Sequence, residues 1–214
     1  ATPAGAEMLK GPLTADAINS EEFADAFRTV ATLDQQNGSA NSSVNANDFA
    51  ADFNNGLSAV FINGVWGASQ FAGSDNFVSC IYPNSVAISS ANTGLYVAND
   101  LSDAQKELAL EFIKYMTSEE VQSRYFLETS SNPINENVDI QKLAQESGDP
   151  TALKLAEACD KCNKADTIVL AIDVCWGNDV GGALQNKFAE CAVAGTDIEA
   201  KLAELQAELT ALIG

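Results

Sequence analysis

The part of the sequence that decides the fold is DFNNGLSAVFINGVW, residues 52–66. Gly56 follows a short helical pattern at the position where a helix commonly ends in a left-handed residue. Residues 57–64 are then rich in β-branched and other strand-forming side chains. Gly64 closes this run and comes two residues before Trp66. The stretch therefore predicts a helix, a buried strand and a turn that presents an indole ring.

Working outward, most other segments have the periodicity and the caps of helices. Asn19, with Glu22 three residues on, predicts a helix start, and Ser102 and Ser118 each begin a capping pattern. Thr196 does the same before a terminal amphipathic helix. The expected helices cover residues 19–33, 47–56, 102–116, 118–132, 139–147, 150–163, 183–191 and 197–212.

Short apolar runs predict the remaining regular structure. Besides residues 57–64, strand candidates are residues 78–81 and 86–88, which flank a turn at Pro83-Asn84, and residues 167–172. Leu108, Phe112 and Met116 lie on one face of their helix, and we expect this face and Tyr125 to be buried. The sequence thus predicts a helix-rich α/β fold.

The composition argues against several functions. The chain of 214 residues has 11 basic and 30 acidic residues, a formal net charge of −19, which disfavours nucleic acids because phosphate binding needs clustered Lys and Arg. It has no histidine, which excludes Ser-His-Asp and Cys-His catalysis and histidine-ligated zinc. We expect no enzyme and no cofactor, with a hydrolase based on paired carboxylates as the remaining enzymatic alternative.

The five cysteines do not form a recognisable metal or redox motif. Cys159 and Cys162 make a CxxC, but it ends a helical pattern, whereas a thioredoxin-like motif begins a helix after a strand. A zinc ribbon would need a second CxxC. We interpret the cysteines as buried or incidental thiols, with room for one disulfide in an exported protein.

Two stretches resemble extracellular solute-binding proteins of ABC transporters, of the maltose- and sugar-binding type (family 1). Residues 52–66 are similar to the family segment F-x-x-G-x-x-A-M-x-x-x-G-x-W, with Val60 in place of Met. Residues 104–122 are similar to its helix pair A-W-E-F-I-K-F-L-T-S-P-E-x-Q, with Glu119 where proline is common. Weaker similarities are found at residues 131–135, at Trp176 and at residues 194–212.

The resemblance implies the C-terminal lobe of a type II periplasmic-binding-protein fold that lacks most of the N-terminal lobe. Residues 19–82 and 136–214 would be two parts of the C-terminal lobe, and residues 83–135 a crossover element belonging partly to the missing lobe. Residues 1–18 precede the resemblance, and their sequence indicates an irregular entry segment. The family implies an extracellular or periplasmic location, with a lipid anchor to the membrane as one form.

The implied function is that of the substrate-binding subunit of an ABC importer, which captures a neutral mono- or oligosaccharide between two lobes and delivers it to the permease subunits. The alternatives are the same carrier class with a polyamine, peptide or metal complex as ligand, or a helical interaction domain without a small-molecule ligand. Exposed apolar surface between the lobes would also favour self-association of this chain. The residues expected to contact the ligand are Trp66, Trp176, Asn63, Asn92, Tyr96 and Asp173, with Asp179 beside them.

Overall fold

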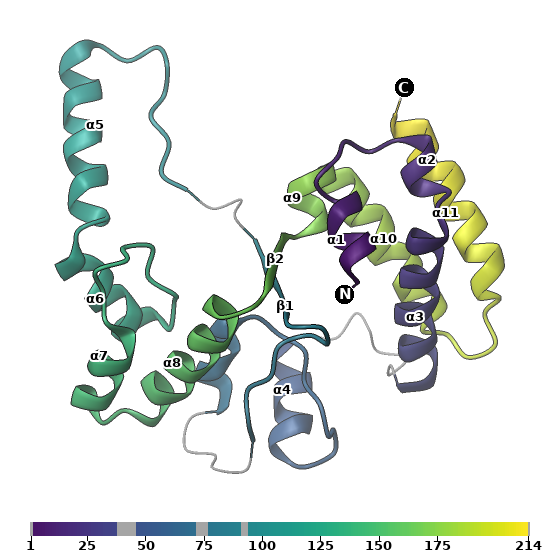
Figure 1. Ribbon diagram of the computed structural model, residues 1–214, viewed down its shortest axis with the longest axis horizontal. Helices are drawn as coiled ribbons and strands as arrows, with labels where there is room; N and C mark the ends of the chain where they lie inside the picture. The colour runs from purple at the N-terminus through teal and green to yellow at the C-terminus, as the bar shows by residue number, and fades with distance from the viewer. Residues whose placement is uncertain (1, 38–45, 72–76, 91–93, 214) are drawn as a thin grey trace. The chain divides into compact units, whose positions relative to one another are not determined.

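The computed structural model describes residues 2–37, 46–71, 77–90 and 94–213. The chain divides into two compact units (Figure 1). The first comprises Ala1–Val44, Tyr82–Asn92 and Asp166–Gly214, and the second comprises Asn45–Ile81 and Thr93–Ala165. These units do not follow the boundaries at residues 18 and 135 that the resemblance implied, and the assignment of each stretch to a lobe stays a prediction.

The first unit is a helical cluster with a small sheet beside it. Three long helices, α3, α10 and α11, pack against one another around a common core. Phe27 of α3 and Phe188 of α10 stack with ring centroids 5.1 Å apart. The elements of this unit are α1 (Pro3–Met8), α2 (Ala15–Ile18), α3 (Glu21–Asn37), β1 (Val86–Ser89), β2 (Thr167–Leu170), α9 (Ile172–Trp176), α10 (Asn178–Cys191) and α11 (Ile198–Leu212).

Helix α11 closes this core from the C-terminal end of the chain. Leu205 and Leu209 are fully buried, in the same cluster as Phe23 and Phe27 of α3. At the surface, Arg28 of α3 donates to Glu199 of α11 through Nε at 2.8 Å. The guanidinium lowers the pKa of Glu199 by hydrogen bonding to its carboxylate. Because both side chains of this pair reach solvent, the buried leucines contribute more to the packing of α11 than the ion pair does.

Strands β1 and β2 form a parallel pair in which Val86 lies opposite Thr167 and Ser89 opposite Leu170. Before β1 the chain turns through Asn84 and Ser85, both with positive φ (63° and 55°), so the expected turn at Pro83-Asn84 is confirmed. The expected strand at residues 167–172 ends at Leu170, because Ala171 already caps α9.

The second unit has its own core. Phe126, Ala144, Leu155 and Cys159, from α6, α7 and α8, are buried together, and η1 packs on α8. A cluster of phenylalanines lies where α4 meets η1, with Phe53 and Phe71 5.2 Å apart. The elements are α4 (Ala46–Asn54), the 3₁₀ helix η1 (Val65–Phe71), α5 (Asp103–Met116), α6 (Glu119–Thr129), α7 (Ile140–Ser147) and α8 (Pro150–Asn163).

Two strand predictions in this unit are wrong. Residues 57–64 form no strand and have no strand alongside them in the described part of the chain, and Val60 and Ile62 are 71% and 69% exposed. Residues 78–81 run along α8 instead: the Ser79 carbonyl accepts from Lys161 Nζ, and the Ser79 amide donates to Glu157 at 3.4 Å. Strand-forming side chains alone do not make a strand, since its backbone needs a hydrogen-bonded neighbour.

The predicted burial of α5 is also wrong. The helix has its capping box at Ser102, as expected, but none of its residues is buried, and Leu108 and Phe112 are 72% and 54% exposed. Tyr125 on α6 is 43% exposed. An apolar stripe is covered only where another element packs on it, and α5 packs chiefly on α6 at one end (Figure 1).

Three smaller expectations near helix ends need correction. The lead-in at residues 1–18 is not irregular, because Thr2 and Thr14 cap α1 and α2 and Ile18 is fully buried. Ser20, not Asn19, caps α3, since its hydroxyl accepts from the Phe23 amide. Asp197, not Thr196, caps α11. None of the helices in the described ranges combines the length and apolarity needed to span a bilayer.

Candidate ligand-binding site

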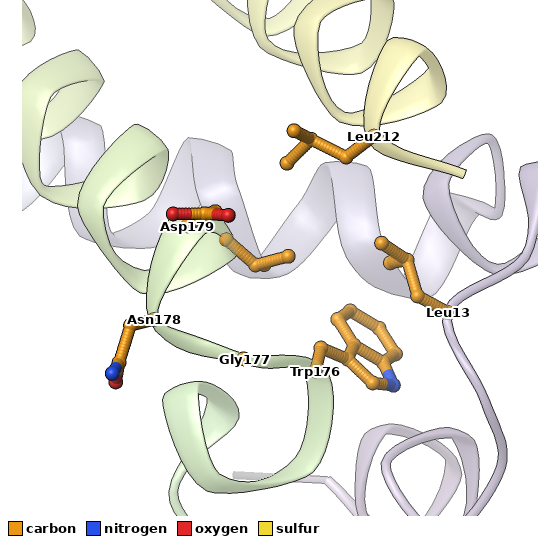
Figure 2. Close-up of a pocket in the computed structure, with 7 residues that line it drawn as sticks. Leu13, Trp176, Gly177, Asn178, Asp179 and Leu212 are labelled. Carbon is orange, nitrogen blue, oxygen red and sulfur yellow. The ribbon is translucent and has the colours of Figure 1, made fainter. Parts of the chain in front are cut away.

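A cavity of about 430 Å³ opens in the first unit beside Trp176 (Figure 2). Apolar side chains from both ends of the chain, Leu13 before α2 and Leu212 at the end of α11, lie on the side of the indole. Asn178 and Asp179 lie on the other side. The cavity thus combines an aromatic and aliphatic wall with a polar rim, and it is open to solvent. Gly177 and Val180 complete the lining.

The α9–α10 junction places the indole and the polar rim together. Helix α9 is only five residues long, and its last residue is Trp176. Gly177 follows with φ 94°, a value that residues with a Cβ rarely adopt, and it donates to the Asp173 carbonyl at 3.0 Å. Helix α10 begins at once, so that Asn178 and Asp179 form its first turn directly beside the tryptophan.

Two neighbouring glycines of α10 make this junction testable. A Cβ on Gly181 would lie 3.0 Å from the Cβ of Asp173 in α9, whereas a Cβ on Gly182 would meet nothing within 4 Å. We expect Gly182→Ala to stabilise the protein by about 0.5–1 kcal/mol, because alanine is the better helix former. Gly181→Ala should not stabilise the protein in this way, because its new Cβ would push against Asp173 and displace α9. Chemical denaturation of the two variants measures the difference, and equal stabilisation by both would contradict a tight α9–α10 contact.

Trp66 lies in the second unit and is 58% exposed, so it is not enclosed in a helical core. Its ring folds back over Gly64, where a Cβ would lie 2.2 Å from the indole carbons. Asn63 belongs to the same turn: its Oδ1 accepts from the Gly64 amide at 2.8 Å, and its Nδ2 lies 3.4 Å from Gln70 Oε1. The second glycine of residues 52–66 is therefore needed for the close approach of the ring, and the Asn63 amide serves the turn.

The other expected site residues are distributed as follows. Tyr96, in the second unit, is 83% exposed. Asp173 is in the first turn of α9 but does not line the cavity at Trp176. Asn92 lies outside the described residues. The ligand roles of all six residues stay predictions.

Leu13 and Leu212 were not predicted to be neighbours of Trp176. They lie 163 and 36 residues away from it in the chain. Leu13 falls in the segment expected to be irregular, and Leu212 falls in a helical pattern that marks it as ordinary core. Asp179 was expected beside the tryptophan, and it lines the cavity. No local motif signals the two leucines, because only tertiary packing brings them to the indole: α2 packs on α3 and α11, and α11 packs on α10.

All five cysteines lie in the described part of the chain, and none is paired. In the described ranges no group of three or more His, Cys, Asp or Glu side chains could hold a metal ion. Cys159 is buried in the core of the second unit, and burial raises the pKa of its thiol to about 12. The CxxC therefore lacks the lowered pKa that redox-active motifs use.

The exposure of each cysteine predicts how fast its thiol reacts. At neutral pH in the folded protein, an aromatic disulfide reagent should modify the exposed Cys80 rapidly and the buried Cys159 only on unfolding. Mass mapping of modified peptides with time checks this. Fast labelling of Cys159 in folded protein would contradict its burial.

Comparison with known proteins identifies the family of this chain. A family model for bacterial extracellular solute-binding proteins matches residues 4–151, which is more than half of the chain. A solved structure of a Streptococcus pneumoniae solute-binding protein in complex with the blood group A trisaccharide is 38% identical, with a TM-score of 0.89. That match covers 98% of this chain and 54% of the S. pneumoniae chain, so this chain spans about half the length of the solved protein. A search of curated proteins found no match.

These matches define the class as a solute-binding protein of helix-rich α/β fold. The chain belongs to the family of bacterial extracellular solute-binding proteins. The resemblance noted in the sequence is thereby confirmed, including its extension through the C-terminal helices, which the solved structure covers.

Proposed function

We propose that this chain supplies part of the ligand site of an extracellular carbohydrate carrier, which binds a mono- or oligosaccharide and delivers it to the permease of an ABC importer. The observation that carries the proposal is the cavity at Trp176, with an aromatic wall and a polar rim. A pyranose ring has an apolar face of C–H groups and an edge of hydroxyls. An indole suits the face because it offers a large rigid contact area, and Asn178 and Asp179 offer hydrogen-bonding groups to the edge.

The family and its relative support the same ligand class. The S. pneumoniae protein was solved with a trisaccharide, and its 38% identity extends over nearly all of this chain. The family name supports an extracellular location. Trp66 and Tyr96, exposed in the second unit, are proposed as further contacts to the sugar. A lipid anchor is a further part of the proposal and is testable by membrane fractionation.

We propose binding without chemical change of the ligand. The chain has no histidine, and its cysteine motif is not activated. After incubation with the full-length protein, a saccharide should be recovered unchanged by mass spectrometry. Cleavage that depends on a single Asp or Glu would instead support a carboxylate-based hydrolase.

Calorimetry on the full-length protein tests the proposal. A panel of neutral mono- and oligosaccharides that includes the blood group A trisaccharide is titrated in parallel with polyamines and peptides. We expect at least one saccharide to bind with a Kd in the micromolar range or below and to change tryptophan fluorescence. If no saccharide binds, the sugar assignment fails, and binding of a polyamine or peptide would assign that ligand class instead.

A further inference from the structure

The loop that follows α1 contacts the indole of the candidate site directly. Trp176 Nε1 donates to the backbone carbonyl of Gly11 at 3.1 Å, across 165 positions of the sequence. On the core side, the ring of Phe23 lies with its centroid 6.4 Å from that of Trp176. The loop after α1 thus holds the indole at its nitrogen, and the ring of Phe23 contacts its ring. The indole also borders the cavity.

The loop itself is anchored on both sides of Gly11. The Gly11 amide donates to the Met8 carbonyl at 3.2 Å, and Met8 Sδ accepts from the Ser20 hydroxyl at 3.5 Å, which ties the end of α1 to the start of α3. On the other side, Thr14 caps α2. Between them, Pro12 restricts both its own φ and the backbone of Gly11, whose carbonyl is the acceptor.

We propose that residues 9–13 are a positioning element of the ligand site, which acts by orienting the Trp176 indole through the Gly11 carbonyl; this rests on the proposed function. Because the indole N–H is occupied, the ring meets a ligand with its apolar surface and not as a donor. The N-terminal part of the unit thereby determines the orientation of an aromatic surface that lies near its C-terminal end.

Pro12→Gly is the test, since Pro12 is exposed and its replacement removes conformational restriction without removing buried contacts. Pro83→Gly is the control: Pro83 is another exposed proline of the same unit, and it does not line the cavity. The 214-residue chain has two tryptophans, so in a Trp66→Phe variant of this chain the indole N–H signal in a proton–nitrogen NMR spectrum comes from Trp176 alone.

We expect the Trp176 indole proton to exchange with solvent faster in Pro12→Gly and to be unchanged in Pro83→Gly. The affinity of the full-length protein for the blood group A trisaccharide should fall about fivefold in Pro12→Gly, the effect of one net hydrogen bond. In a Trp176→Phe background, which lacks the indole N–H, Pro12→Gly should cause no further loss.

Unchanged indole exchange in Pro12→Gly would overturn the proposal, as would faster exchange with unchanged affinity. An equal additional loss of affinity in the Trp176→Phe background would also overturn it, because the loop would then act other than through the indole. If the parent protein binds no saccharide, the proposed function fails, whereas the exchange measurement still decides whether the loop holds the ring.

Discussion

Replacing Trp176 by alanine should weaken saccharide binding by the full-length protein by about 30-fold or more, the loss typical of a tryptophan at the centre of a binding site. The reason is that the indole is the aromatic wall of the cavity, between Leu13, Leu212 and the polar rim of α10. Isothermal calorimetry with the best saccharide of the panel measures the change.

Two further variants distinguish loss of the aromatic contact with the ligand from a general disturbance of the fold. Trp176→Phe keeps an aromatic face and loses the hydrogen bond to Gly11, so it should weaken binding by less than about tenfold. Leu212 is 47% exposed, so Leu212→Ala should weaken saccharide binding with little effect on the stability of the fold. An alanine variant of Trp176 that stays folded and binds as tightly as the parent would remove the cavity from the proposed site.

Replacing Leu205 by alanine should have the largest effect on stability, about 2–5 kcal/mol of unfolding free energy in the first unit. Leu205 is fully buried in α11, in the cluster formed with Phe23 and Phe27 of α3. Truncation removes apolar contacts and leaves a cavity that the rigid helices around it fill only in part. Denaturant unfolding followed by circular dichroism measures the loss.

The matched control is Leu212→Ala on the same helix. Leu212 lies two turns further along α11 and is half exposed, so its truncation should cost less than about 1 kcal/mol. Equal losses for the two variants would contradict the arrangement in which α11 closes the core with its middle and borders the cavity with its end.

Much of the secondary structure could be read from local signals. Ser102 with Gln105 predicts the start of α5, and Pro150 after Gly148 predicts the break between α7 and α8, where Gly148 has the expected positive φ of 63°. These signals are reliable because a cap or a left-handed glycine involves atoms only a few residues apart. The family resemblance at residues 52–66 and 104–122 was specific for a similar reason: it depends on the order and spacing of residues.

The tertiary structure decided which strand-forming segments are paired and which apolar faces are covered, because both depend on a second segment of the chain. Val60 and Ile62 have the side chains of a strand, but no strand lies beside them in the described residues. Phe112 has the position of a core residue on α5, yet no described element covers it. In both cases the local pattern states only a preference, which is realised when another segment supplies hydrogen bonds or apolar contact.

The candidate site shows the same division. Its aromatic residue could be named from the sequence, since Trp176 is one of two tryptophans and follows a predicted strand. Its surroundings could not, because Gly11, Leu13 and Leu212 reach the indole only through the packing of α1 and α2 on α3 and of α11 on α10. The sequence by itself determined most of the longer helices and the class of protein. The tertiary structure decided which faces are covered and which side chains meet, because contacts between distant segments leave no local pattern.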